Sequence, residues 1–134
     1  MAKDRLLTEM RALRDRVVGV TDSVLASRDG LIIAADTATI DPDNLAALGA
    51  AMIGLAQRMA AEAGQGSLRD SVTRNSGGYV ATYAVGGEAL LVVLGDTGLN
   101  WALLYRESRS TVDNLGNLLA QASPRADGTA AAAS

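Results

Sequence analysis

Apolar positions along the chain follow two periods, which predict helices at both ends and strands between them. Leu6, Met10, Leu13 and Val17 have the spacing of one helix face, and charged residues fill the positions between them, so we expect a helix over residues 3–18. A second leucine-rich segment, residues 99–122, predicts a closing helix. We expect its inner face to consist of Leu104, Val112, Leu115 and Leu119.

Short apolar runs predict five strands in two groups. Residues 23–27 and 31–35 are separated by Asp29-Gly30, a pair typical of a tight hairpin turn because both residues tolerate positive φ. Residues 68–74, 79–85 and 89–94 form the second group, joined by glycine-containing turns. The first of these three carries several charges, as an edge strand does. The last is apolar on both faces, which is typical of a central strand.

The segment 42–64 predicts a long helix with almost no polar face. Asp41 supplies an N-cap and Pro42 a first turn. A helical wheel places the large apolar residues on one stripe, which we expect to lie against the domain's own sheet: Leu45, Leu48, Met52, Leu55 and Met59. Beside it runs a stripe of short side chains that we expect to contact a partner helix: Ala46, Gly49, Ala50, Ile53 and Ala60.

Two interpretations of these small residues are open. Alanine is a strong helix former, so its abundance needs no partner. The glycines at 49 and 54 lower helix propensity, however, and this favours a close contact with a second helix.

Together the elements predict an α+β domain over residues 1–122, with residues 123–134 as a disordered tail. The expected architecture is a five-stranded antiparallel sheet with one long helix on one face and two terminal helices on the other.

Composition narrows the classes of function. The chain has 134 residues, and its 12 basic and 15 acidic side chains give a net charge of −3, which argues against nucleic acid or an anionic membrane as the main partner. It contains no histidine and no cysteine, so imidazole bases, thiolates, disulfides and the usual zinc sites are absent. We expect no cofactor and no metal. The charged N-terminus does not resemble a signal peptide, and the apolar run 45–56 is too short to span a bilayer, so we expect a cytoplasmic protein without membrane insertion.

Three stretches carry a family resemblance: VGVTDSVLASRDGLIIAAD, LAALGAAMIGLAQRMAAEAGQG and GGYVATYAVGGEALLVVL followed by the leucine-rich helix. In order and spacing they resemble the roadblock family of dynein light chains and small-GTPase regulators, and within it the bacterial members encoded beside a Ras-like GTPase. The resemblance covers about residues 6–119. It implies a profilin-like α-β-β-α-β-β-β-α fold and a homodimer in which the long helices pack antiparallel and the third strands pair. The charges on this chain's third strand depart from an ideal pairing edge.

The resemblance also implies a role, and the residue pattern supplies candidate contacts for it. The role is a platform that binds a Ras-like small GTPase and modulates its nucleotide cycle, or scaffolds it to a sensor kinase, without a catalytic residue. The expected dimer interface comprises Ala46, Gly49, Ala50, Ile53, Gln57 and Ala60 on the helix, with Arg69, Ser71 and Thr73 on the third strand. Arg58 and Glu62 are the expected GTPase contacts.

Other functions are also compatible with these residues. Asp96-Thr97-Gly98 after an apolar strand resembles the active-site loop of dimeric aspartic proteases, although the same residues form an ordinary turn into a helix. An arginine could act on a transferring phosphate, but each candidate is more simply a solvated charge: Arg28, Arg58, Arg69 and Arg74.

A small-ligand sensor of profilin-like architecture is a further alternative. Its pocket would need convergent polar groups and aromatic residues. The aromatic side chains of this chain are interpreted instead as core or rim residues: Tyr79, Tyr83, Trp101 and Tyr105.

Overall fold

The computed structural model describes residues 2–122, so the expected tail at 123–134 lies outside the described residues. Three helices and five strands follow one another along the chain. In order they are α1 (Ala2–Arg16), β1 (Val20–Ser27), β2 (Ile32–Asp36), α2 (Pro42–Glu62), β3 (Asp70–Asn75), β4 (Gly78–Val85), β5 (Ala89–Gly95) and α3 (Trp101–Ala122). This order confirms the α+β fold expected from the sequence.

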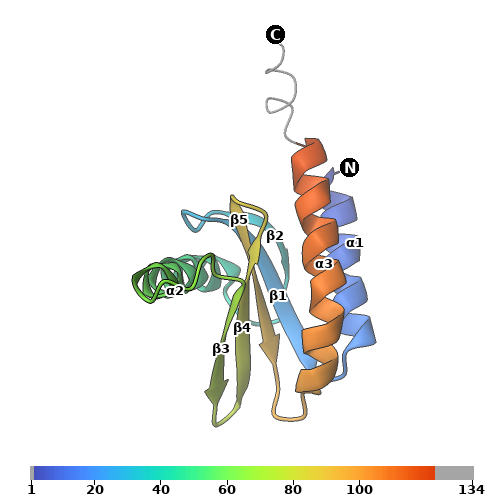
Figure 1. Ribbon diagram of the computed structural model, residues 1–134. Coiled ribbons are helices and arrows are strands. Elements are labelled where there is room, and N and C mark those ends of the chain that lie inside the picture. The colour runs from blue at the N-terminus through green and yellow to red at the C-terminus, as the bar shows by residue number, and fades with distance from the viewer. Residues whose placement is uncertain (1, 123–134) are drawn as a thin grey trace.

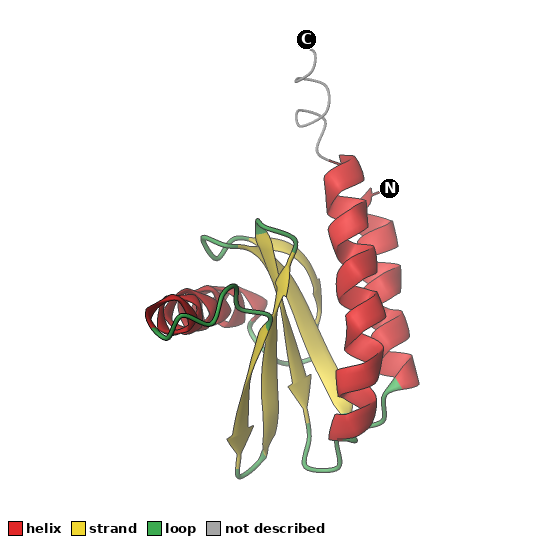
Figure 2. Cartoon of the chain, viewed as in Figure 1, coloured by secondary structure: helices red, strands yellow, loops and turns green. Residues whose placement is uncertain are grey.

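The strands form one antiparallel sheet in the order β2-β1-β5-β4-β3 (Figure 2). The apolar strand β5 therefore lies at the centre and the charged strand β3 at an edge, both as expected. Helix α2 crosses one face of the sheet, while α1 and α3 lie side by side on the other (Figure 1). The two sheet edges are β2 and β3.

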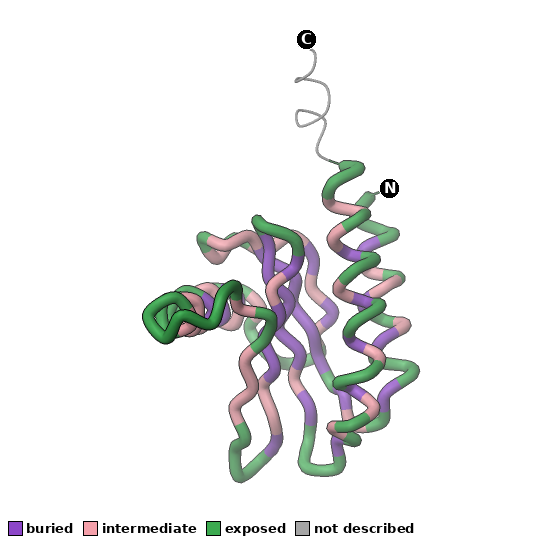
Figure 3. The backbone as a smooth tube through the Cα atoms, viewed as in Figure 1, coloured by how far each residue is buried: buried purple, intermediate pink, exposed green. Residues whose placement is uncertain are grey.

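Two apolar clusters fill the spaces between the layers. The larger one lies between the sheet and the α1/α3 pair and contains Leu6, Met10, Leu13 and Val17, the face predicted for the first helix. The smaller one, beneath α2, includes Val24, Ile53 and Val92. Figure 3 shows that buried residues are concentrated in the central strands, whereas α2 is largely exposed along its outer side.

Ion pairs on the α1 side connect the first helix to its neighbours. The Arg14 guanidinium donates to the Asp36 carboxylate at 3.1 Å, and Asp36 is only 8% exposed at the end of β2. Arg16 donates to Glu107 of α3 at 2.8 Å. These contacts fix α1 against both the β2 edge and α3.

The hairpin turn between β1 and β2 differs from the expected geometry. Only Gly30 has a positive φ, of 89°, and no residue other than glycine has one in the described chain. Asp29 therefore does not share the left-handed conformation that we expected. The Gly30 amide instead donates to the Ser27 carbonyl at 2.9 Å, which closes the turn with a single left-handed residue.

Candidate functional site

Helix α2 is held at both ends by polar contacts. At its start the Asp41 carboxylate accepts from the Asp43 amide at 3.0 Å, as an N-cap does, and Pro42 begins the helix. Near its end the Gln57 side-chain oxygen accepts from the Leu68 amide at 2.9 Å. Gln57, expected at a dimer interface, thus anchors the loop that leads into β3.

The expected assignment of the faces of α2 is wrong. Ala46 and Ile53 are 0% and 2% exposed, Gly49 is buried with them, and all three face the chain's own sheet. A Cβ at Gly49 would lie 2.6 Å from Val92 Cγ2, so this glycine lets the helix approach β5 closely. These three residues are therefore not available to a second copy. Ala50 and Ala60 are half-buried beside them.

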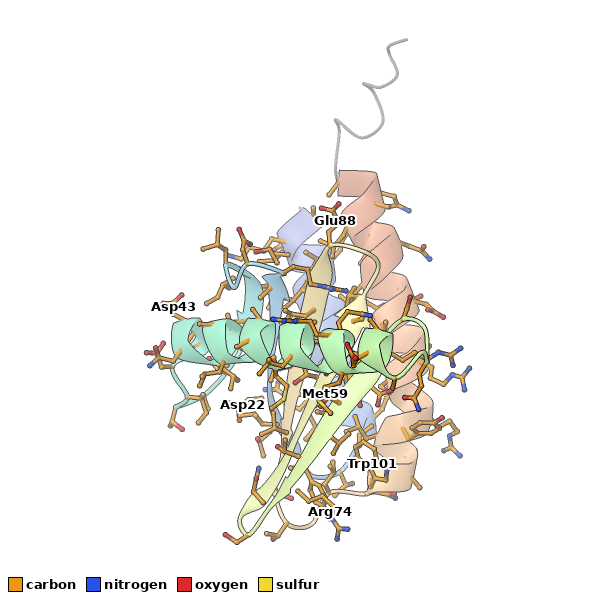
Figure 4. The ribbon with its side chains drawn as sticks, turned by 60° about the vertical axis from the view of Figure 1, so that its left-hand side comes forward. Asp22, Asp43, Met59, Arg74, Glu88 and Trp101 are labelled. Carbon is orange, nitrogen blue, oxygen red and sulfur yellow. The ribbon has the colours of Figure 1, made fainter. Side chains whose placement is uncertain are left out.

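The large apolar residues of α2 lie on the outside instead. Leu48 is 68% exposed, Leu55 63% and Met59 71%, and the half-buried Met52 lies among them. We call these four residues the α2 stripe. Figure 4 looks onto α2 in front of the sheet, with Asp43 at one end and Met59 toward the other. Exposed apolar side chains gathered along one helix are typical of a surface that a partner covers.

Strand β3 adds an unpaired edge next to this helix. It pairs with β4 alone, so half of its backbone groups have no strand partner. Val72 packs toward the α1/α3 side, which places the half-buried Ser71 and Thr73 on the α2 side. Arg69, just before the strand, is exposed. The structure thus places Ser71 and Thr73 of the expected interface on the α2 side, whereas Arg69 lies at the start of the strand near α3.

The two expected GTPase contacts lie near each other on the outer side of α2. Arg58 and Glu62 are both exposed, and no ion pair joins them in the described chain. They are free to contact another protein. We recognised the residues of the α2 stripe in the sequence but placed them against the sheet. Gly49 held a signal for the correct face, because a glycine in a long helix can mark close packing on the helix's own sheet.

The motif at residues 96–98 is a turn. The Asp96 carboxylate accepts from the Gly98 amide at 2.9 Å, and the chain then enters α3. The structure therefore agrees with the interpretation of this motif as a turn into a helix rather than as a protease loop.

Within residues 2–122 no group of three or more acidic side chains is placed to hold a metal ion. Among these residues no helix has the length and apolar content needed to cross a bilayer.

Comparisons with known proteins agree with this architecture. The chain is similar to two uncharacterized proteins of Methanocaldococcus jannaschii. MJ0310 is 30% identical over 84% of this chain and 95% of its own length, and MJ1340 is 32% identical over 75% and 85%.

Solved structures show the same fold. Gliding protein MglB of Thermus thermophilus superposes with a TM-score of 0.82 at 19% identity, covering 91% of this chain and 93% of that one. A Roadblock/LC7 domain of Streptomyces avermitilis gives a TM-score of 0.77 at 26% identity, covering 84% and 95%. The sequence model of the Roadblock/LC7 domain family matches residues 6–95 of this chain. The chain therefore belongs to the Roadblock/LC7 domain family.

Proposed function

We propose that this protein is a non-catalytic regulator or scaffold that homodimerises and binds a Ras-like small GTPase. The observation that carries the proposal is the α2 stripe lying beside an unpaired sheet edge. Burying apolar surface gains about 25 cal/mol per Å², so the exposed side chains of Leu48, Leu55 and Met59 favour association. A two-fold partner would cover the stripe with the same residues of its own α2.

The edge strand β3 supports the same assembly. If two copies of β3 pair antiparallel about Val72, Ser71 of one copy lies opposite Thr73 of the other, and Asp70 lies opposite Arg74. Each Asp70 then meets the Arg74 of the second copy. The charged residues of β3, which depart from an ideal pairing edge, would thus form pairs of opposite charge between the two copies in this register.

The GTPase surface in this proposal is the outer side of the two α2 helices. Arg58 and Glu62 lie there in each copy, exposed and without intramolecular partners. MglB is a gliding protein, and another solved structure of MglB has a tetrameric arrangement, so a neighbour in fold assembles through its surfaces. The link to a Ras-like GTPase comes from the family resemblance of the sequence.

Dimerisation is tested by a charge on the α2 stripe. Leu55→Glu places a carboxylate in a contact that must lose water, so we expect sedimentation analysis to show a monomer with unchanged helicity. Gly54→Glu is the matched control, since Gly54 is exposed on the other flank of the helix and has open space around it. A wild-type monomer at tens of micromolar would contradict the proposal.

GTPase binding is tested by calorimetry. A Ras-like GTPase from the same genome is loaded separately with GDP and with a slowly hydrolysed GTP analogue, then titrated with this protein. We expect one nucleotide state to bind more tightly, which by linkage means that the complex stabilises that state. Arg58→Glu and Glu62→Arg should weaken binding without splitting the dimer. Equal or absent binding in both states would reject the regulatory role.

A further inference from the structure

A polar hollow lies between α3 and the edge of the sheet at β3 and β4. Its volume is about 430 Å³, which is within the range of small-molecule sites. Its lining residues come from the start of β3, from β4 and its turn, and from one face of α3. It lies against α3 at this end of the sheet and contains none of the residues assigned above to the GTPase.

Charged side chains of both signs surround this hollow without pairing. Arg69 and Asp70 line it from β3, and Arg109 and Asp113 line it from α3. None of the four takes part in an ion pair or side-chain hydrogen bond in the described chain. By contrast, arginines on α1 form ion pairs with carboxylates, as Arg14 does with Asp36. The hollow therefore presents cationic and anionic groups that a ligand can satisfy.

Two tyrosines and two larger aliphatic side chains also line the hollow. Tyr83 of β4 forms part of the wall and is 5% exposed, and its hydroxyl has no hydrogen-bond partner. Tyr105 is 53% exposed at the rim. Leu68 and Val112 are half-buried and apolar. Convergent charges, aromatic rings and an apolar surface in one hollow are the features of a ligand site that the sequence pattern did not reveal.

We propose that this hollow binds a free α-amino acid. Arg69 and Arg109 hold the carboxylate, because guanidinium groups match its geometry. Asp113 accepts from the α-ammonium group, and the ligand's side chain packs against Tyr105 and Val112. The arginines complement the ligand's negative group and Asp113 complements its positive group, which favours a zwitterion over a simple anion or cation.

This inference does not rest on the proposed GTPase role or on the homodimer. In the dimer described above, Asp70 would be shared with Arg74 of the second copy. Asp113 of α3 then remains as the acceptor for the ammonium group, and Arg109 of α3 remains for the carboxylate where Arg69 contacts the second copy. Binding measured on the Leu55→Glu variant separates the two proposals.

The test is calorimetric titration of the full chain with each of the twenty free amino acids at millimolar concentration. We expect at least one to bind and to raise the Tm by several degrees when saturating. The same amino acid with its amine acetylated, or with its carboxylate amidated, should not bind. Arg109→Gln and Asp113→Asn, both at exposed positions, should weaken binding by about tenfold or more, since each removes a charge-assisted hydrogen bond.

Arg106→Gln, at an exposed position of the same helix outside the hollow, is the matched control and should bind like the wild type. Circular dichroism verifies that each variant is folded. The inference is overturned if no amino acid binds, if the blocked derivatives bind as well as the free ligand, or if Arg106→Gln weakens binding as much as Arg109→Gln does.

Discussion

At the scale of single residues, the buried Tyr83 makes the stability of the fold depend on pH in the alkaline range. Burial raises the pKa of Tyr83 to about 12 from 10.0, with the Ser108 side chain opposing the rise and the charge of Asp70 adding to it. The folded state therefore prefers the neutral phenol. Its contribution to the free energy of unfolding is complete below pH 10 and is lost as the pH rises from 10 toward 12. We expect a loss of roughly 2–3 kcal/mol across this window, measured by urea denaturation.

Tyr83→Phe should remove that part of the pH dependence. At neutral pH the substitution should cost little, because the lost hydroxyl has no hydrogen-bond partner. Tyr105→Phe at the exposed rim is the control and should retain the wild-type loss. The explanation fails if both variants, or neither, change the difference in stability between pH 9 and pH 11.

At the scale of elements, helix α2 shows what a sequence pattern can and cannot predict. Its start at Pro42 and its end within two residues of the expected boundary follow from local signals, the cap and the glycine at 64. The face of α2 that meets the sheet does not follow from local signals, because the helix has apolar residues on two adjoining stripes. The stripe of short side chains faces the sheet, because Gly49 allows the helix axis to come close to Val92. The hollow beside α3 was equally hidden because its residues come from three separate segments.

The two glycines of α2 should therefore respond oppositely to alanine. Gly49→Ala places a Cβ 2.6 Å from Val92 Cγ2, so we expect it to destabilise the protein by about 1–3 kcal/mol. Gly54→Ala meets open space and should stabilise the protein by about 1 kcal/mol through helix propensity. Urea denaturation of the Leu55→Glu background, designed to be monomeric, measures both effects without a contribution from dimerisation. Equal effects of the two substitutions would contradict this account of the packing of α2.

At the scale of the whole molecule, a charge exchange tests the pairing of β3 between copies. Asp70→Arg alone would place two arginines opposite each other, and Arg74→Asp alone two aspartates, so we expect each to weaken the dimer. The double variant restores opposite charges in the proposed register and should recover dimerisation. Sedimentation analysis over a range of concentrations measures all three. If the double variant dimerises no better than the single ones, β3 pairs in another register or not at all.

The ion pairs at the other edge of the sheet have a consequence for how far assembly can grow. With β3 paired, each dimer would expose β2 at both ends, and β2 strands meeting in turn would build a fibre without limit. Arg11 and Arg14 both lie within 4 Å of the Asp36 carboxylate, so two guanidinium groups share one carboxylate beside that edge. A second β2 would bring an identical surplus. We expect this repulsion to stop growth at the dimer, and light scattering in high salt, where the charges are screened, to show larger particles.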